Sequence, residues 1–164
     1  NGGWEIAKRL LMHERTNISA EAFGNAAGLD LIETARQFVG LREGVLANTD
    51  LRARIARHRM RDEAFRLAVQ QARTGHGRSS SAATSALASS FKVAAASLNQ
   101  ERCELLLECL GHEGLGWEGE GFSTDALRAT RHWLRSKGNS IEGGTTEINL
   151  NVIAKRVLGL PDPV

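Results

Sequence analysis

The residues best suited to chemistry lie near the C-terminus, in a glycine-bearing stretch that leads into a helical pattern. Residues 138–148 read GNSIEGGTTEI. Gly143 and Gly144 can adopt backbone angles closed to other residues, and they leave no side chain in the way of a ligand. Thr145 and Thr146 can cap the helix that follows, whose free N–H groups and positive dipole end favour an anionic group. Taken alone, the pattern is more typical of a capped terminal helix without a ligand.

The order of residues changes that interpretation. The run Ile-x-Gly-Gly-Thr-x-Glu-Ile at 141–148, followed by Asn-x-Ile-Ala-x-Arg-Val-Leu-Gly-Leu-Pro at 151–161, resembles the C-terminal signature of the acyl-CoA dehydrogenases. In that flavoenzyme family the segment carries part of the active site and contacts FAD. The resemblance implies cofactor contacts at Ile141, Thr145 and Glu147. It places Glu142, Gly143 and Gly144 beside the acyl-CoA substrate.

The resemblance also raises the question of the catalytic base. The reaction removes a proton α to the thioester and passes the β hydride to flavin, so a carboxylate must reach the α carbon. Many family members place that glutamate immediately before the Gly-Thr of the signature, where this chain has Gly143. A smaller set places it on the first helix of the domain, before an arginine. Glu14 and Arg15 resemble that pair, with Arg15 near the substrate. From residue types alone, a Glu-Arg pair on a solvated helix face is the commoner case. Because Gly143 has no side chain, the resemblance makes Glu14 the predicted base, and Glu142 is the second candidate.

A second region resembles the family's Gln-x-x-Gly-Gly-x-Gly turn, which touches the FAD of a neighbouring subunit. Here residues 108–114 read ECLGHEG, so that Glu108 and Gly111 are candidate cofactor contacts while His112 replaces a glycine. Residues 114–119 match the Gly-x-Gly-x-x-Gly dinucleotide pattern, but no strand is predicted before them, and we interpret them as a loop. Residues 37–44 lack the Arg-x-Phe-Gly order that the family uses to reach FAD.

Composition places the chain among ordinary globular proteins. Its 164 residues suffice for one core, with 41% hydrophobic and 24% charged residues. A net charge of +2 gives no support for a nucleic-acid partner, and no apolar run is long enough to span a bilayer. Cys103 and Cys109 lie on a helical stretch and are interpreted as small core residues in a reducing cytoplasm. Neither the cysteines nor the histidines have the spacing of a metal site.

Helical periodicity without β-branched alternation predicts an all-α fold. The predicted helices span Trp4 to about Leu41, about Asp50–Arg73, Ser81–Leu110, Asp125–Arg135 and about Thr145–Leu158. The apolar faces expected on the first three are Leu29, Ile32, Ala35 and Val39; Met60, Ala64, Leu67 and Gln71; and Leu87, Phe91, Ala94, Leu98, Leu105 and Cys109. Gly159 and Pro161 end the last helix. An antiparallel four-helix bundle with a short additional helix, and no sheet, is the predicted architecture.

These expectations lead to two hypotheses about function. Residues 1–164 are expected to form one bundle domain, the C-terminal part of a three-domain flavoenzyme with its own N-terminal and middle domains. The first hypothesis is a cytoplasmic acyl-CoA dehydrogenase that forms a homo- or hetero-tetramer and passes electrons from FAD to an electron-transfer acceptor. The alternative is a non-catalytic subunit domain that serves assembly.

Overall fold

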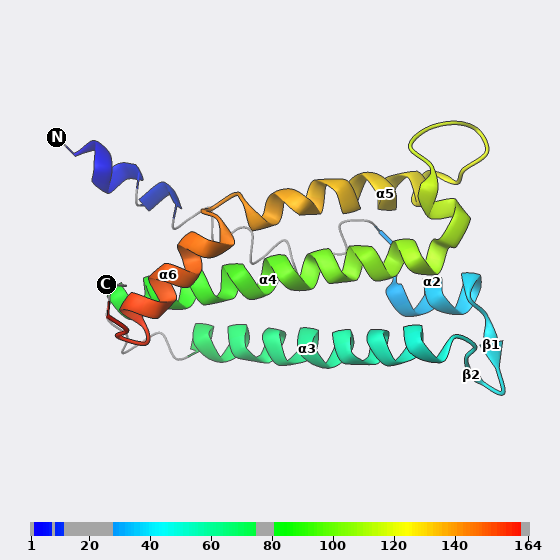
Figure 1. The fold of residues 1–164 in the computed structure, drawn as a ribbon, viewed down its shortest axis with the longest axis horizontal. Helices are drawn as coiled ribbons and strands as arrows, with labels where there is room; N and C mark the ends of the chain where they lie inside the picture. Colours follow the sequence, from blue (N-terminus) through cyan, green and yellow to red (C-terminus); the bar gives the residue numbers. More distant parts are fainter. Residues whose placement is uncertain (1, 8, 12–27, 75–80, 162–164) are drawn as a thin grey trace. The chain divides into compact units, whose positions relative to one another are not determined.

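The computed structural model describes residues 2–7, 9–11, 28–74 and 81–161. Within these ranges the regular structure is helical apart from one short hairpin, which confirms the predicted all-α class. Residues 3–7 and 9–11 are helical. The elements labelled in Figure 1 are α2 (Leu31–Phe38), β1 (Leu41–Arg42), β2 (Val45–Leu46), α3 (Thr49–Thr74), α4 (Ser81–Leu110), α5 (Thr124–Ser136) and α6 (Thr146–Arg156). Two short 3-10 helices, η1 (Gly111–Leu115) and η2 (Lys137–Ser140), precede and follow α5. The bounds predicted from the sequence for α3, α4, α5 and α6 agree with these to within about two residues.

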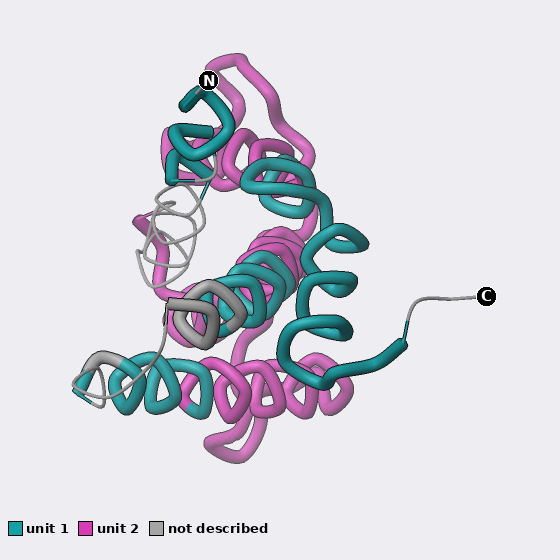
Figure 2. Tube along the Cα trace, turned by 90° about the vertical axis from the view of Figure 1, so that its left-hand side faces the viewer, with its two compact units in different colours: residues 1–23, 64–97, 138–164 teal, residues 24–63, 98–137 magenta. Residues whose placement is uncertain are grey.

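The chain divides into two compact units, coloured teal and magenta in Figure 2. Unit 1 comprises residues 1–23, 64–97 and 138–164, and unit 2 comprises residues 24–63 and 98–137. The long helices α3 and α4 each contribute one part to unit 1 and the other part to unit 2. The signature stretch therefore belongs to unit 1, and the turn at residues 108–114 belongs to unit 2.

The core of unit 2 is apolar. Side chains from α2, the first part of α3 and the last part of α4 pack together there: Leu31, Ala35, Leu51, Ile55, Leu105, Leu106 and Cys109. Arg54 pairs with Glu108 while Arg61 pairs with Glu101, so α3 and α4 run antiparallel within this unit. A smaller cluster adds α5 through Ala126 and Ala129, which pack on Leu110. Cys103 and Cys109 are buried free thiols, in agreement with their interpretation as core residues.

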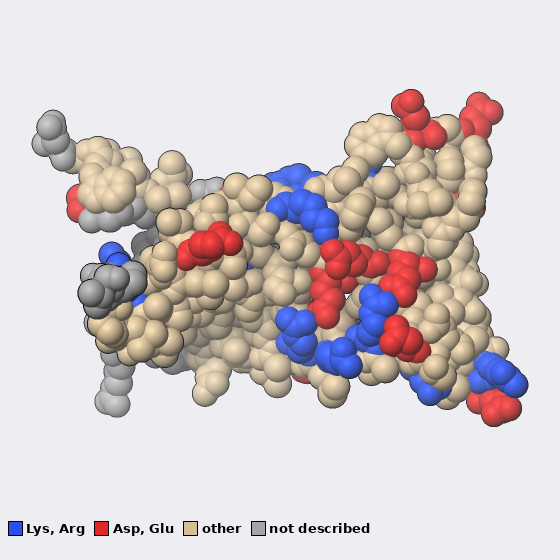
Figure 3. Space-filling view, in the orientation of Figure 1, with Lys and Arg blue, Asp and Glu red and all other residues tan. Residues whose placement is uncertain are grey.

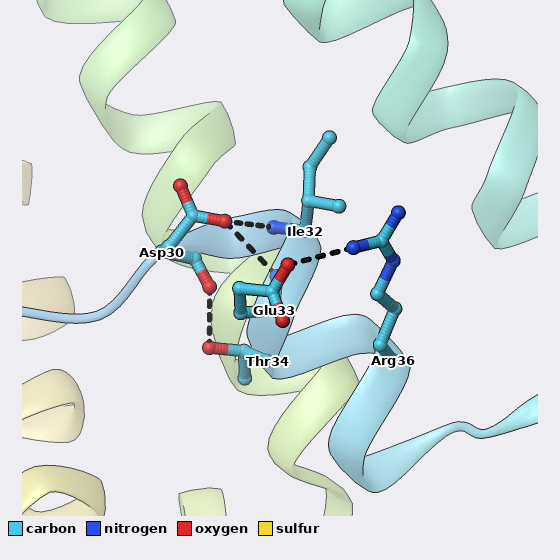
Figure 4. A network of polar contacts seen from close by, with 5 residues as sticks. All are labelled: Asp30, Ile32, Glu33, Thr34 and Arg36. Atoms are coloured by element: carbon cyan, nitrogen blue, oxygen red, sulfur yellow. Dashed lines mark hydrogen bonds and ion pairs between the residues drawn. The ribbon is translucent and has the colours of Figure 1, made fainter.

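Helix α2 begins at Leu31 because Asp30 caps it. The Oδ1 atom of Asp30 accepts hydrogen bonds of 2.9 Å from the N–H groups of Ile32 and Glu33, as Figure 4 shows. The Thr34 hydroxyl donates to the Asp30 carbonyl over 2.6 Å. Asp30 itself has extended backbone angles. The expectation of one helix from Trp4 to Leu41 was therefore wrong at residues 28–30, where the chain turns before a separate short helix.

The hairpin of β1 and β2 corrects the expectation that there would be no sheet. Leu41 pairs with Leu46 and Arg42 with Val45, which leaves a two-residue loop. Both loop residues, Glu43 and Gly44, have positive φ angles of 53° and 78°. This is the type I′ turn that suits the twist of two antiparallel strands. The hairpin occupies the segment where the Arg-x-Phe-Gly order is missing.

The apolar face expected for α3 was also wrong. Met60, Ala64, Leu67 and Gln71 are all exposed, with Met60 at 67% and Leu67 at 51%. The buried positions of this helix are Leu51, Ile55, His58, Phe65 and Val69. Apolar residues occupy two faces of α3, and the one that packs is decided by contacts with other helices, which periodicity alone does not specify.

Acidic and basic side chains alternate over the α3–α4 face of unit 2 (Figure 3). Glu101 Oε2 lies 2.8 Å from Arg61 Nη1 and 3.0 Å from the Nδ1 atom of the buried His58. Lys137 Nζ lies 2.6 Å from Glu104 Oε1. Arg54 and Arg61 of α3 are therefore each paired with a carboxylate of α4 on this face.

Candidate functional site

The glycine loop of the signature is a tight turn between η2 and α6. The N–H groups of Ile141 and Glu142 both donate to the carbonyl oxygen of Gly138 over 2.9 Å. Gly143 and Gly144 follow with φ angles of 66° and 93°, in the left-handed region that other residues seldom adopt. The two glycines thus have the conformational role that the sequence predicted for them.

The carbonyl oxygen of Gly144 is held from inside unit 1. Lys92 Nζ, from α4, donates to it over 2.7 Å, and Asn149 Nδ2, from α6, donates to it over 2.8 Å. The Asn149 amide also donates to the carbonyl of Thr145 over 3.0 Å. Both side chains are fully buried, at 0% exposure. Burying a lysine is costly, since the charged amine loses its water, and the hydrogen bond to the Gly144 carbonyl offsets part of that cost.

Thr145 caps α6, as the sequence predicted. Its hydroxyl oxygen accepts a hydrogen bond from the N–H of Ile148 over 3.4 Å, and its backbone is extended. Glu147 lies in the first turn, exposed to solvent. Its own backbone N–H lowers the pKa of the Glu147 carboxyl, with smaller contributions from the Thr145 hydroxyl and the charge of Lys92. The start of α6 is therefore an electropositive environment.

The remaining signature residues differ in how they are held. Glu142 is half-buried, and its Oε1 atom accepts a hydrogen bond of 2.6 Å from Asn139 Nδ2, which fixes the carboxylate beside the loop. Ile141 projects into solvent with 66% of its surface exposed. At the far end of α6, Leu160 N–H donates to the Ala154 carbonyl over 3.0 Å, and Gly159 has a φ of 65°. The helix ends where Gly159 and Pro161 predicted.

The turn at residues 108–114 is built around an ion pair. Glu108 lies 2.7 Å from Arg54 Nη1, and this contact raises the pKa of the arginine. Gly111, with a φ of 56°, ends α4 and begins η1. The Gly114 carbonyl accepts from the Thr130 hydroxyl over 3.0 Å. The literal dinucleotide pattern at 114–119 follows helical structure, so no strand leads into it, as predicted.

Glu14 and Arg15, the candidate base and its neighbour, lie outside the described residues. Of the other sequence-predicted site residues, Ile141, Glu142, Gly143, Gly144, Thr145 and Glu147 lie together on one stretch of unit 1, and Glu108 and Gly111 lie in unit 2. Sequence reasoning missed Lys92 and Asn149. The only signal for Lys92 was a single cation within a run of small and apolar residues on α4, from Leu87 to Leu98.

Comparison with known proteins identifies the family. The chain matches the family described as acyl-CoA dehydrogenase, C-terminal domain, over residues 1–158, and it belongs to that family. Its fold is similar to that in the crystal structure of the ChsE4-ChsE5 complex from Mycobacterium tuberculosis, with a TM-score of 0.63 and 24% sequence identity. That similarity covers 82% of this chain and 34% of the other, so the chain spans about a third of the length of the protein chain it matches there. No curated protein sequence matches significantly.

None of the helices in the described ranges is both long enough and apolar enough to cross a membrane.

Proposed function

We propose that this chain is the C-terminal domain of an FAD-dependent acyl-CoA dehydrogenase, acting together with N-terminal and middle domains of the same protein. The proposal rests on the glycine loop of a chain that belongs to this family. Gly143 and Gly144 have left-handed backbone angles, and the Gly144 carbonyl accepts a hydrogen bond from the buried Lys92. In this proposal the enzyme is cytoplasmic and a homo- or hetero-tetramer. It passes its electrons to a separate electron-transfer acceptor.

In this proposal the start of α6 contacts the FAD. Among the described residues no group accepts a hydrogen bond from the Thr145 N–H, and that residue is partly exposed. A donor that has no acceptor within the described part of the chain, at the positive end of a helix, suits an acceptor-rich group. Ile141, Thr145 and Glu147 would hold FAD here. Glu108 and Gly111 would contact the FAD of a neighbouring subunit, with Arg54 neutralising the glutamate that replaces the family's glutamine.

The chain's own residues have distinct roles in the proposed reaction. Glu14 takes the α proton of the acyl thioester, and Arg15 lies near the substrate. Gly143 leaves space where other family members carry the base, and Glu142 lies beside the thioester. FAD, when bound, accepts the β hydride, so that a carbon–carbon double bond forms between the α and β carbons.

A specific observation favours the second candidate, a non-catalytic subunit domain that serves assembly. The family's glutamine at the second region is Glu108, and its carboxylate is occupied by Arg54 at 2.7 Å rather than left for a cofactor. A carboxylate also lacks the N–H donors of a glutamine amide. In that case the chain would pair with a catalytic partner subunit.

The two candidates are separated by cofactor content and turnover. The full-length protein would be purified, its bound FAD measured by absorbance after denaturation, and acyl-CoA oxidation assayed with an artificial electron acceptor. Stoichiometric FAD with turnover supports the dehydrogenase. A purified protein without FAD or turnover that gains both only with a second subunit supports the assembly role.

A further inference from the structure

The described part of unit 1 buries polar side chains next to apolar ones. Lys92, Ser89 and Asn149 are fully buried there, in the same unit as the buried Phe65, Val69, Ala95 and Ala96. Buried polar groups cost free energy, and replacing a buried charge with an apolar side chain of similar size is often neutral or stabilising. The presence of these polar side chains inside unit 1 is therefore not explained by stability alone.

Two of them, Lys92 and Asn149, hold the glycine loop. The two amino groups of Lys92 and Asn149 converge on one oxygen, the Gly144 carbonyl, over 2.7 and 2.8 Å. The carbonyl and the N–H of a trans peptide point in opposite directions. With the Gly144 carbonyl directed at these buried donors, the N–H of Thr145 is directed away from them.

Asn149 gives independent evidence that Lys92 and Asn149 have a role beyond filling the core. Its Nδ2 donates to two carbonyls, which fixes the orientation of the amide. Its buried Oδ1 has no hydrogen-bond partner among the described residues. Unpaired buried oxygens are rare in native proteins and are found where structure serves a site.

We propose that Lys92 and Asn149 are positioning residues: they hold the Gly144–Thr145 peptide so that the Thr145 N–H is presented to an acceptor group of the bound cofactor. The ligand part rests on the proposed function, whereas the loop part does not. Neither residue touches the ligand.

The test uses Lys92→Met in the full-length protein, which removes the charge and the donor but keeps the length of the side chain. Lys137→Met is the matched control, because Lys137 makes an equally short contact, 2.6 Å to Glu104, on the surface of unit 2. Hydrogen exchange of peptides covering 138–148 and 98–137 would be followed without ligand, together with urea unfolding and FAD affinity by fluorescence titration.

For Lys92→Met, exchange in 138–148 should rise about ten- to a hundredfold, as expected for one lost hydrogen bond to a charged donor. Exchange in 98–137 and the urea midpoint should stay unchanged, and the affinity for FAD should fall about tenfold. Lys137→Met should change neither the loop nor the affinity. Asn149→Leu, which removes the other donor, should act on the same loop.

Three results would overturn the inference. Unchanged exchange in 138–148 would show that Lys92 does not hold the loop. A rise in exchange across both peptides, or failure of both Lys92→Met and Asn149→Leu to fold, would show a purely structural role. A loosened loop with unchanged FAD affinity would remove the ligand part. If the protein proves to bind no FAD at all, the proposed function fails, and the exchange measurement still decides whether Lys92 positions the loop.

Discussion

Arg54 on α3 and Glu108 on α4 form an ion pair of 2.7 Å at the start of the turn that the family uses for a cofactor contact. Both side chains are about 40% exposed, so the pair contributes only about 0–1 kcal/mol to the free energy of unfolding. Its consequence is chemical rather than energetic. The carboxylate is engaged by a cation, and the position offers no N–H donor to a ligand.

The first prediction concerns that position. Glu108→Gln restores the residue type usual in the family, and we expect it to change the urea unfolding free energy by at most about 1 kcal/mol. If the turn contacts FAD, the amide should raise cofactor retention during dialysis of the full-length protein. Arg54→Met is the control, since it frees the carboxylate without supplying a donor. If the unmodified protein and both variants retain FAD equally, this turn does not take part in cofactor binding.

The second prediction concerns the left-handed glycine at the place of the usual base. Gly143 has a φ of 66°, so Gly143→Ala should lower the free energy of unfolding by about 1–2 kcal/mol through backbone strain. Gly121 is the matched control, because its backbone is not left-handed and no atom lies within 4 Å of an added Cβ. Gly121→Ala should be close to neutral. Urea unfolding of both variants measures the difference, and similar losses in both would argue against strain at Gly143.

These cases show how far the sequence could predict the molecule. The helix at Ser81–Leu110 was predicted with the bounds that the structure has, because one apolar stripe continues along it between clear breaks. The packed face of α3 was not predicted correctly. Met60 and Leu67 are as apolar as Ile55 and Phe65, and only the contacts with neighbouring helices decide which of them are buried. Lys92 and Asn149 escaped notice for a different reason: polar residues are expected at the surface, and only tertiary contacts bury them.

The third prediction is a pH dependence of stability. Burial raises the pKa of the Cys109 thiol to about 11 from an ordinary 9.0; Glu108 adds to the shift and Arg54 opposes it. Between pH 9 and 11 the unfolded thiol has lost its proton while the folded one keeps it. Stability therefore falls as the pH rises through this range, by about 1–3 kcal/mol. Urea unfolding at pH 8 and pH 10.5 measures the fall. Cys109→Ala should reduce the loss of stability between pH 8 and pH 10.5. If the loss is the same in this variant, other titrating groups cause it.

The fourth prediction concerns assembly. Apolar side chains on α6 and at its C-terminal cap are about half exposed: Ile148 at 52%, Leu150 at 49% and the cap residue Val157 at 50%. Leu150 and Val157 are seven residues apart and share one side of the helix, and the proposed enzyme is a tetramer in which such apolar side chains would meet a partner. We expect the 164-residue chain to self-associate in sedimentation velocity, and Leu150→Lys with Val157→Lys to yield smaller species. Leu134→Lys on α5 is the control at an equally exposed leucine. A monomer at all concentrations would contradict the prediction.

The last prediction assigns the base. An α C–H beside a thioester is a weak acid, so a positioned carboxylate must take its proton, and Gly143 has no side chain to do so. Glu14 and Glu142 are the two carboxylates that the family resemblance makes available.

Glu142 is already held by Asn139 Nδ2 at 2.6 Å, so its carboxylate is engaged within the loop. We therefore expect Glu14→Gln to lower the turnover of the full-length enzyme by about 10²–10⁴-fold, with FAD content unchanged. Glu142→Gln keeps the oxygen that accepts from Asn139, so its effect on turnover should be much smaller. Acyl-CoA oxidation with an artificial acceptor measures both variants. Loss of turnover only in Glu142→Gln would move the base to the signature loop. Normal turnover in both would show that neither carboxylate takes the proton.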